Sequence, residues 1–549
     1  MTSVTVGSWP PAAPGVPARA TSRSAAESRE RTLATVLAVV AAIVTYGLAV
    51  RLGFAYDDDP MLVQNRLIHS LAELPDALAR PYWMQYGTLY RPLTTLTFGI
   101  DWAISGGAPW LFHLMNVLWH ALASALVVRL ALRWLPAGAA AFAGLAFAVH
   151  PVHVEAVCNA VGRSEVMCGA ALLGVALVAT QRTLRDRDAL LLVALLSFAA
   201  LGAKETGVTA PVIAAAGCWV ATRDRARTLR FALWSSMGVL PLLVARLTIL
   251  GSLGGDQPHM AFQATTWWGG LTLALAMLPR AIAIMLVPQR PVYEYSPTSD
   301  ALANPDAAMM ALGVLLVLGG VLAVVQVVRR PSWPAFALLF TAVTLAPVSN
   351  LFLKAGIVLA ERTMYAPSIG VVLVLAGALA PALGSLRTAT RRLACGGAAF
   401  WLGASAGLVW HDVPVWDSTV SVVRAFTERN PQSYAGWMFL GNVHLLQNER
   451  PQALAAYSHA LTLFDRDHRL VHAAAMEMVF AGDTADAEYW LRTALARWPA
   501  SRRSRTVLAR LLVKRGQGAE ALKVLDAGLA IEPDQRVWAT LRDSLRAGR

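Results

Sequence analysis

Apolar stretches of about twenty residues recur along this sequence between Leu33 and Trp410. Each is long enough to cross the hydrocarbon core of a bilayer, which is about 30 Å thick. Only 15% of the residues are charged, well below the roughly 25% of an average soluble domain. Runs such as 312–328 and 371–380 do not alternate in polarity as the strands of a membrane β-barrel do. The sequence therefore predicts an all-α, polytopic helical membrane protein.

The basic residues predict how such a chain is oriented. Five arginine clusters each flank an apolar stretch: Arg129/Arg133, Arg182/Arg185/Arg187, Arg223/Arg225/Arg227/Arg230, Arg329/Arg330 and Arg387/Arg391/Arg392. Basic loops concentrate on the cytoplasmic side, so all five clusters and the N-terminus are expected there. About eleven spans within residues 31–412 satisfy the clusters if 260–290 follows an interfacial or re-entrant path. The loop 54–108 and the C-terminus are then outside.

Composition adds three expectations. Residues 1–30 are rich in Pro, Ala and Ser and are expected to form a disordered cytoplasmic tail before a first span that serves as a retained signal anchor. The excess of Arg over Lys is typical of GC-rich coding and favours a bacterial plasma (inner) membrane. The basic residues are spread over short loops rather than along one face, which argues against nucleic acid as a partner.

The region 416–549 repeats. Two sets of residues are each spaced 34 apart: Ala453, Ala487 and Ala521, and Leu461, Leu495 and Leu529. This is the period of the tetratricopeptide repeat, in which two helices pack as a pair. The sequence predicts three such repeats, stacked into a superhelix whose concave face commonly takes peptides.

Asp57 and Asp58 directly follow the first span, where the helix bundle is expected to open. Two adjacent carboxylates repel each other, which raises the pKa of one of them. A raised pKa suits a general base that accepts a hydroxyl proton near neutral pH. The structural alternative is an acidic cap on a helix that begins at Pro60, for which Asp59 is well placed. Both interpretations remain open on spacing alone.

Further polar residues lie near the same side. Arg91, Lys204, Lys354 and Arg362 form a set of cations suited to a phosphate, although a structural ion pair explains each one equally well, with Glu205 as a counter-charge for Lys204. Other candidates are polar where apolar residues would have sufficed: His113, Asn116, His150, His153, Glu155, Arg163, Glu205 and Tyr365. The spacing His150-x-x-His153-x-Glu155 resembles a metal site, but Pro151 interrupts it, so a helix cap is preferred and no metal is predicted.

Several motifs occur in a characteristic order: Tyr56-Asp57-Asp58, Tyr90-Arg91-Pro92-Leu93, Phe112-His113-x-x-Asn116, His150-Pro151-x-His153-x-Glu155, Gly162-Arg163, Lys204-Glu205 and Glu361-Arg362-x-x-Tyr365. Together with the repeats, they resemble the transmembrane-and-tetratricopeptide O-mannosyltransferases and their bacterial relatives. These enzymes belong to the GT-C glycosyltransferases. The resemblance covers nearly the whole chain and implies a GT-C-like transmembrane domain followed by a tetratricopeptide superhelix.

The resemblance implies an inverting transfer of one sugar, mannose or another hexose, from a polyprenyl-phosphate donor to a hydroxyl acceptor on the outside face. The acceptor is expected to be a protein Ser or Thr, held by the repeats. Asp57 or Asp58 is the expected base, and Arg362, Lys204 and Arg91 are the expected ligands of the donor phosphate. No cofactor is required if these cations suffice, although a divalent metal is left open. Two alternatives remain: transfer to a lipid or surface glycan, and a noncatalytic membrane scaffold that uses its repeats for assembly.

Overall fold

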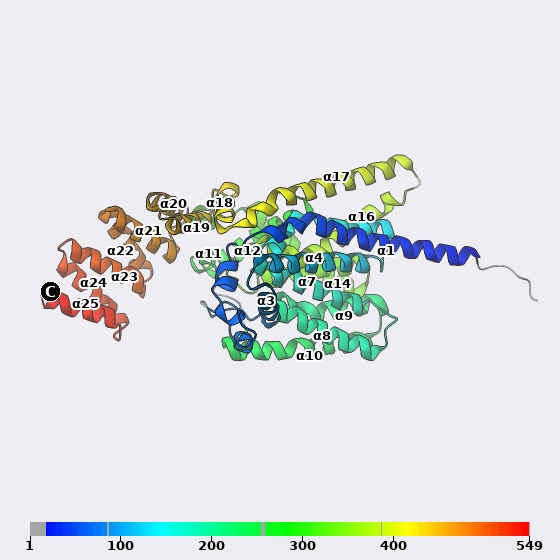
Figure 1. The fold of residues 1–549 in the computed structure, drawn as a ribbon, viewed down its shortest axis with the longest axis horizontal. Coiled ribbons are helices and arrows are strands. Elements are labelled where there is room, and N and C mark those ends of the chain that lie inside the picture. The colour runs from blue at the N-terminus through cyan, green and yellow to red at the C-terminus, as the bar shows by residue number, and fades with distance from the viewer. Residues whose placement is uncertain (1–17, 85–86, 254–257, 386, 548–549) are drawn as a thin grey trace, which may run out of the picture.

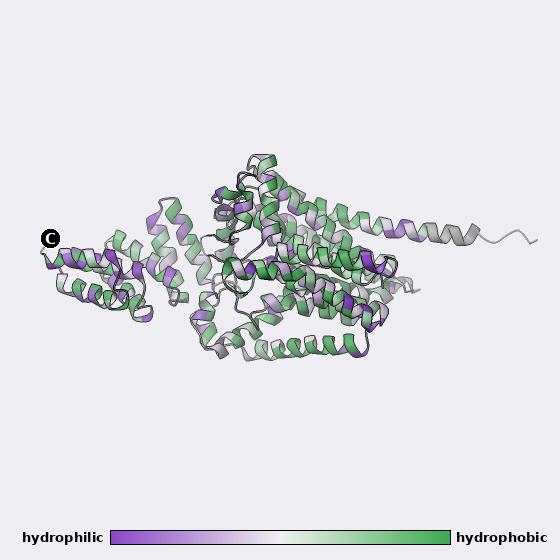
Figure 2. Ribbon diagram, turned by 90° about the horizontal axis from the view of Figure 1, so that it is seen from below, coloured by the Kyte–Doolittle hydropathy of each residue, from purple (hydrophilic) through white to green (hydrophobic). Residues whose placement is uncertain are grey.

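The computed structural model describes residues 18–84, 87–253, 258–385 and 387–547 (Figure 1). Every regular element within these residues is a helix. A bundle of long helices forms one part of the molecule, and a succession of shorter helix pairs extends from one end of it (Figure 1). Figure 2 shows mainly hydrophobic residues in the bundle and a mixture of hydrophilic and hydrophobic residues in the extension. The predicted all-α fold class is confirmed.

The bundle consists of α1 (Ala18–Tyr46), α4 (Pro109–Ala131), α5 (Ala137–Val149), α7 (Arg163–Ala179), α8 (Asp186–Ala203), α9 (Ala210–Thr222), α10 (Arg225–Leu250), α12 (Trp267–Leu286), α14 (Ala307–Arg329), α15 (Trp333–Leu345), α16 (Tyr365–Leu383) and α17 (Thr388–Asp412). Short elements connect them: η1 (Gly47–Arg51), η2 (Asp59–Val63), η3 (Arg66–Ile68), α2 (Leu74–Leu78), α3 (Pro92–Ser105), η4 (Pro151–His153), α6 (Val154–Cys158), η5 (Ala160–Gly162), η6 (Glu205–Thr209), α11 (Met260–Gln263), α13 (Ser299–Ala303), η7 (Ala346–Val348) and η8 (Glu361–Met364).

Within the described ranges, eight helices are long and apolar enough to cross a membrane. They are α1 and α17, each with its following turn, α7 and α16, each with its preceding turn, and α4, α10, α12 and α14. The bent pair of α5 with Pro151–Cys158, which turns by 46°, makes up to nine. The sequence predicts about eleven, because it leaves out α12, which it expects to be interfacial or re-entrant, and adds α8, α9 and α15. The helices α5, α9 and α15 have 13 residues each, which is about 20 Å of helix, and α8 starts with three charged residues.

The helix α12 occupies the segment expected to be interfacial or re-entrant. It is long and apolar enough to cross, yet residues on both sides of it contact the C-terminal extension. The carbonyl of Ala264 accepts a hydrogen bond from Arg466 at 3.2 Å. The carbonyl of Pro291 accepts one from Arg429 at 2.6 Å. Both ends of α12 therefore lie at the same end of the bundle.

The opposite end of the bundle holds the arginine clusters. Arg133 donates to Gln181 at 3.2 Å, and the Nε of Arg227 lies 3.2 Å from Asp186. Arg223 donates to the carbonyl of Pro331. The first helix also starts at this end, and it begins at Ala18 rather than after the expected tail 1–30, because Ala, Arg and Glu in 18–30 favour helix. Residues 1–17 of that expected tail lie outside the described residues.

The extension begins with η9 (Val413–Asp417) and α18 (Thr419–Arg429) and continues as α19 (Tyr434–Leu446), α20 (Arg450–Leu463), α21 (His468–Ala481), α22 (Thr484–Arg497), α23 (Arg502–Lys514), α24 (Gly518–Ile531) and α25 (Arg536–Arg546). From α19 to α24 the helices form three consecutive pairs. Ala453, Ala487 and Ala521 are fully buried in the second helix of each pair, where a larger side chain would separate the helices. The 34-residue spacing therefore reflects equivalent packing positions.

Candidate active site

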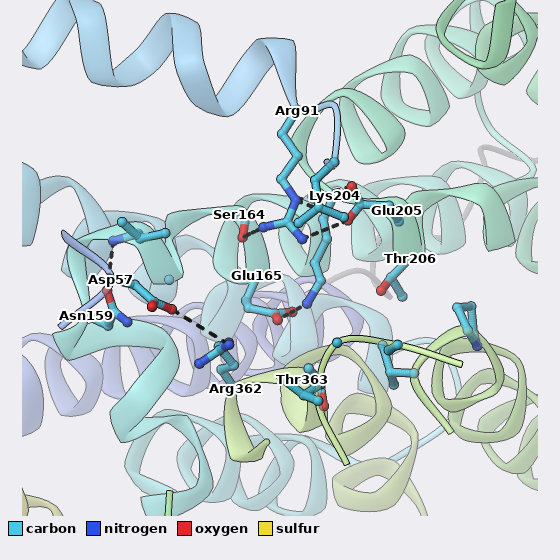
Figure 3. A pocket seen from close by; sticks show the side chains of 18 of the residues that line it. Asp57, Arg91, Asn159, Ser164, Glu165, Lys204, Glu205, Thr206, Arg362 and Thr363 are labelled. Carbon is cyan, nitrogen blue, oxygen red and sulfur yellow. Dashed lines mark hydrogen bonds and ion pairs between the residues drawn. The ribbon is translucent and has the colours of Figure 1, made fainter. Parts of the chain in front are cut away.

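A cavity of about 160 Å³ opens at the end of the bundle from which the repeats extend. Its walls come from loop 54–108, the turns around η5 and η6, and the segment between η7 and η8 (Figure 3). The lining residues are Asp57, Trp83, Leu89, Arg91, Asn159, Val161, Gly162, Ser164, Glu165, Lys204, Glu205, Thr206, Pro347, Val348, Ala355, Gly356, Ile357, Arg362 and Thr363. Charged and polar side chains from distant parts of the chain therefore meet in one hollow.

The two adjacent aspartates have different surroundings. Asp57 lines the cavity, and its side chain is 19% exposed. Asp58 is fully buried and does not line it. Its carboxylate accepts hydrogen bonds from the backbone N–H of Ala55 at 3.1 Å and of Val161 at 2.9 Å. Asp58 therefore caps the turn after the first span and ties it to η5, whereas Asp57 faces the hollow.

Burial also shifts the pKa of both carboxyl groups. It raises the pKa of Asp57 above its ordinary value, although Arg362 opposes this by lowering it. Burial raises the pKa of Asp58 to about 7, although the backbone N–H groups that donate to its carboxylate lower it. Of the two, only Asp57 combines a raised pKa with access to the cavity, which is the combination that a general base requires.

Each predicted phosphate ligand is held by a carboxylate. Arg91 bonds Glu205 through two guanidinium nitrogens, at 3.0 and 2.8 Å, and Ser164 at 3.4 Å. Lys204 is paired with Glu165. Arg362 is paired with Glu155 through its side chain and its backbone N–H, and its second terminal nitrogen lies 3.8 Å from Asp57. The cavity therefore contains ordered ion pairs (Figure 3).

The partner of Lys204 is not the neighbouring Glu205 that the sequence offers. Lys204 has an extended backbone at the end of α8, which turns its side chain away from the next residue and toward Glu165 on α7. Glu205 is left to accept from Arg91 and from Arg246, which lies 3.3 Å away. Burial alone would raise the pKa of Glu205, but Arg91 and Arg246 lower it to about 2.

The charges that line the cavity balance. Arg91, Lys204 and Arg362 contribute three positive charges, and Asp57, Glu165 and Glu205 contribute three negative ones. A phosphate entering this site would therefore be stabilised by oriented donors rather than by a net positive charge. An ammonium group has three N–H donors and a guanidinium has five, so one cation can bond a carboxylate and a phosphate together.

The remaining candidates differ in their relation to the cavity. Glu155 and Glu205 bond its arginines. Six others are buried and bond partners inside the bundle. His113 bonds the carbonyl of Gly53, Asn116 bonds Val157, Asn159 and Ala160, His150 accepts from Val152, His153 bonds Phe147 and Ser368, Arg163 bonds Asp101, and Tyr365 bonds His120. None of these six lines the hollow: His150 caps the turn η4, and the other five connect separate segments of the bundle.

The other predicted cation, Lys354, is also absent from the lining. It donates to the carbonyls of Gly270 at 3.1 Å and Asn350 at 2.6 Å, and thus holds the segment after η7 against α12. Among the residues that the structure describes, no group of three or more His, Cys, Asp or Glu side chains is arranged to hold a metal ion. His150 and His153 bond different partners and do not converge with Glu155.

Three lining or neighbouring residues were not singled out as site residues from the sequence. Glu165 pairs Lys204, Arg246 bonds Glu205, and Ser164 accepts from Arg91. Glu165 and Ser164 follow Gly162-Arg163 directly, so the polar turn 162–165 could have indicated both residues as part of the site. Arg246 lies in the apolar helix α10 and is 5% exposed, and an arginine inside an apolar span usually has a buried partner.

Comparisons with known proteins point to one group. Protein O-mannosyl-transferase TMTC3 of Mus musculus is 26% identical over 469 residues, which cover 76% of this chain and 49% of that protein. TMTC3 of Homo sapiens is 25% identical over 72% of this chain and 47% of its own length. Tmtc2 of Drosophila melanogaster is 35% identical over 32% of this chain and 20% of its own length. The chain is a distant relative of these proteins.

A tetratricopeptide repeat family model also matches residues 481–545, which contain α22 to α24 and most of α25. This match confirms the predicted tetratricopeptide superhelix, and the relatives confirm the resemblance drawn from the motifs. The chain spans about half the length of the first two relatives. Their activities, substrates and partners therefore enter only as proposals for this chain.

Proposed function

We propose that this chain is a glycosyltransferase that moves a single hexose, mannose in the first place, from a polyprenyl-phosphate donor to a protein Ser or Thr hydroxyl. The observation that carries the proposal is the cavity at the repeat end of the bundle. It places the carboxylate of Asp57 within 3.8 Å of Arg362 and in the same hollow as Arg91 and Lys204. The similarity to protein O-mannosyl-transferases supports it.

In the proposed reaction, Asp57 accepts the proton of the acceptor hydroxyl. The hydroxyl oxygen attacks the anomeric carbon from the side opposite the phosphate, so a new C–O bond forms as the C–O bond to the phosphate breaks. The configuration at the anomeric carbon inverts. The bonding electrons leave with the lipid phosphate, which gains negative charge as the bond breaks.

Positively charged donors are needed where that charge develops. Arg362 is the first candidate, because it lies next to Asp57 and its guanidinium can bond Glu155 and a phosphate oxygen with different nitrogens. Lys204 and Arg91 follow, since both line the same cavity. No metal is part of this proposal, because the oriented N–H donors of these three residues can stabilise the developing negative charge.

The proposal also assigns the cavity and the repeats to one side of the membrane. The arginine clusters lie at the end opposite the cavity, and the positive-inside rule assigns such an end to the cytoplasm. The cavity and the repeats would then both lie outside a bacterial plasma membrane, where a bound acceptor protein gains a high local concentration near Asp57. A protease-cleavable tag placed after Arg549 should be cut from outside in spheroplasts. Protection of the tag until lysis would place the repeats in the cytoplasm.

The test of the activity uses the full chain in nanodiscs. Radiolabelled polyprenyl-phosphate mannose is incubated with a Ser/Thr-containing peptide, a lipid acceptor or an oligosaccharide, and the anomer of the product is determined. We expect labelled peptide of inverted configuration, and no product from the Asp57→Asn variant. Label found only in the lipid or the oligosaccharide would show that the acceptor is a lipid or a glycan and not a protein. Equal labelling by wild type and Asp57→Asn would contradict the proposed base.

A further inference from the structure

The turn that carries Asp57 is held from two sides. On the bundle side, the carbonyl of Gly53 bonds His113 at 3.1 Å and the carboxylate of Asp58 accepts from Val161. On the repeat side, the backbone N–H of Gly53 lies 3.4 Å from the Asp417 carboxylate. A Cβ added at Gly53 would approach the carbonyl oxygen of Asp417 to 2.8 Å, so the two segments are in close backbone contact.

Tyr56 is the centre of this contact. Its backbone N–H donates to the hydroxyl of Thr419, at the start of α18, with a distance of 2.9 Å. Its ring meets two rings of the repeat region edge to face: Phe426 of α18 at 5.3 Å and Phe439 of α19 at 5.6 Å between centroids. Tyr56 thus connects the first loop directly to the first helices of the repeat region.

The backbone of Tyr56 also requires such support. Its φ is +54°, in the left-handed region that residues other than glycine rarely adopt. A non-glycine residue keeps this conformation only when its surroundings enforce it. The next residue is Asp57, so a change of φ at Tyr56 would rotate Asp57 relative to Arg362 and the cavity.

We infer that the start of the repeat region is a positioning element of the site: Thr419, Phe426 and Phe439 hold Tyr56 in its left-handed conformation and thereby aim Asp57 into the cavity. The inference rests on the proposed role of Asp57 as the base. It gives the repeat region a function besides acceptor binding. A partner that displaces α18 or α19 would change the geometry of Asp57 from outside the cavity.

The experiment uses the full-length protein in nanodiscs with two readouts. Hydrogen–deuterium exchange reports the protection of the turn 53–58, and single-turnover and steady-state transfer assays report kcat and the KM for the lipid donor. The variants are Tyr56→Ala, Phe439→Ala and Thr419→Val. Tyr56→Phe and Thr419→Ser keep the ring and the hydroxyl respectively, and Trp538→Ala removes a buried aromatic from the far end of the repeats.

We expect exchange in the turn to rise about tenfold or more in the three disruptive variants, because its supporting contacts are lost. We expect kcat to fall by about tenfold or more, with an unchanged KM for the donor, since Tyr56 does not line the cavity. Thr419→Ser and Trp538→Ala should behave as wild type in both readouts, and Tyr56→Phe should keep the wild-type exchange of the turn. If Tyr56→Ala fails to fold, Thr419→Val, which is nearly isosteric, decides the test.

Two results would overturn the inference. One is unchanged exchange at 53–58 in all the disruptive variants. The other is raised exchange with unchanged kcat, which would mean that the aim of Asp57 does not depend on the repeats. A wild-type protein that transfers no sugar would instead contradict the proposed function, while the exchange measurement would still show whether the repeats hold the turn.

Discussion

The cavity and the buried cluster of Arg163, Asn116 and Asp101 both contain arginine–carboxylate pairs, but they differ in exposure. Arg163 is 0% exposed, donates to Asn116 at 3.0 Å and to the carbonyl of Phe112 at 2.7 Å, and is paired with Asp101. Arg362 is likewise paired with a buried glutamate, but its side chain is 22% exposed at a cavity. An ion pair enclosed on all sides can only hold helices together, whereas one that opens on a cavity can also meet a ligand.

The largest expected effect separates Asp57 from Asp58. Asp57→Asn should lower sugar transfer by about 10²–10⁴-fold, the usual contribution of a general base, and should leave thermal stability in detergent nearly unchanged. Asp58→Asn should instead lower the melting temperature, because an amide NH₂ would face one of the two backbone N–H donors. An active Asp57→Asn variant together with a stable but inactive Asp58→Asn variant would show that Asp58, and not Asp57, is the base.

The next effect concerns the buried cluster. Arg163→Met leaves Asp101 buried without its cation, and breaking a buried pair usually costs about 3–5 kcal/mol. We expect a large fall in melting temperature, measured in detergent, with no specific loss of turnover in the protein that remains folded. The double variant Arg163→Met/Asp101→Leu should recover part of the stability, because it leaves no unpaired charge. A double variant as unstable as the single one would show that other polar contacts of Arg163 dominate.

Substitutions of Arg362, unlike those of Arg163, should lower turnover more than stability. Arg362→Ala should lower turnover by about 10²–10³-fold, as removal of one donor to a developing negative charge commonly does. Arg362→Lys keeps the charge and loses only the fork geometry, so a smaller loss is expected. Equal losses would indicate bidentate phosphate recognition. Full activity of both variants would make Arg362 structural, like Arg163.

The smallest effect is a shift in pH dependence. Because the pKa of Asp57 is raised and the base must be ionised, kcat/KM should fall as pH decreases through a value above the ordinary carboxyl range. Glu155 raises this pKa and Arg362 lowers it. Glu155→Gln should therefore move the acidic limb to lower pH, and Arg362→Lys should leave it nearly in place. An acidic limb that moves to higher pH in the Glu155→Gln variant would contradict Asp57 as the titrating group.

The sequence by itself determined the class of fold. Apolar runs of spanning length require helices in a membrane, because backbone groups in hydrocarbon must bond within their own segment. The 34-residue spacing predicted the helix pairs of the repeat region, since Ala453 and its equivalents occupy close helix contacts. The polar turns also predicted which segments would meet at the cavity, since Asp57, Arg91, Lys204 and Arg362 all line it.

The tertiary structure alone decided which partner each ion has and which aspartate faces the cavity. Lys204 pairs with a residue 39 positions away, and Arg362 with one 207 positions away. Such pairings depend on how helices pack, which no local pattern encodes. Asp57 and Asp58 are neighbours of the same type, and one peptide unit turns their side chains in different directions. The direction is set by Tyr56, whose contacts lie more than 360 residues along the chain.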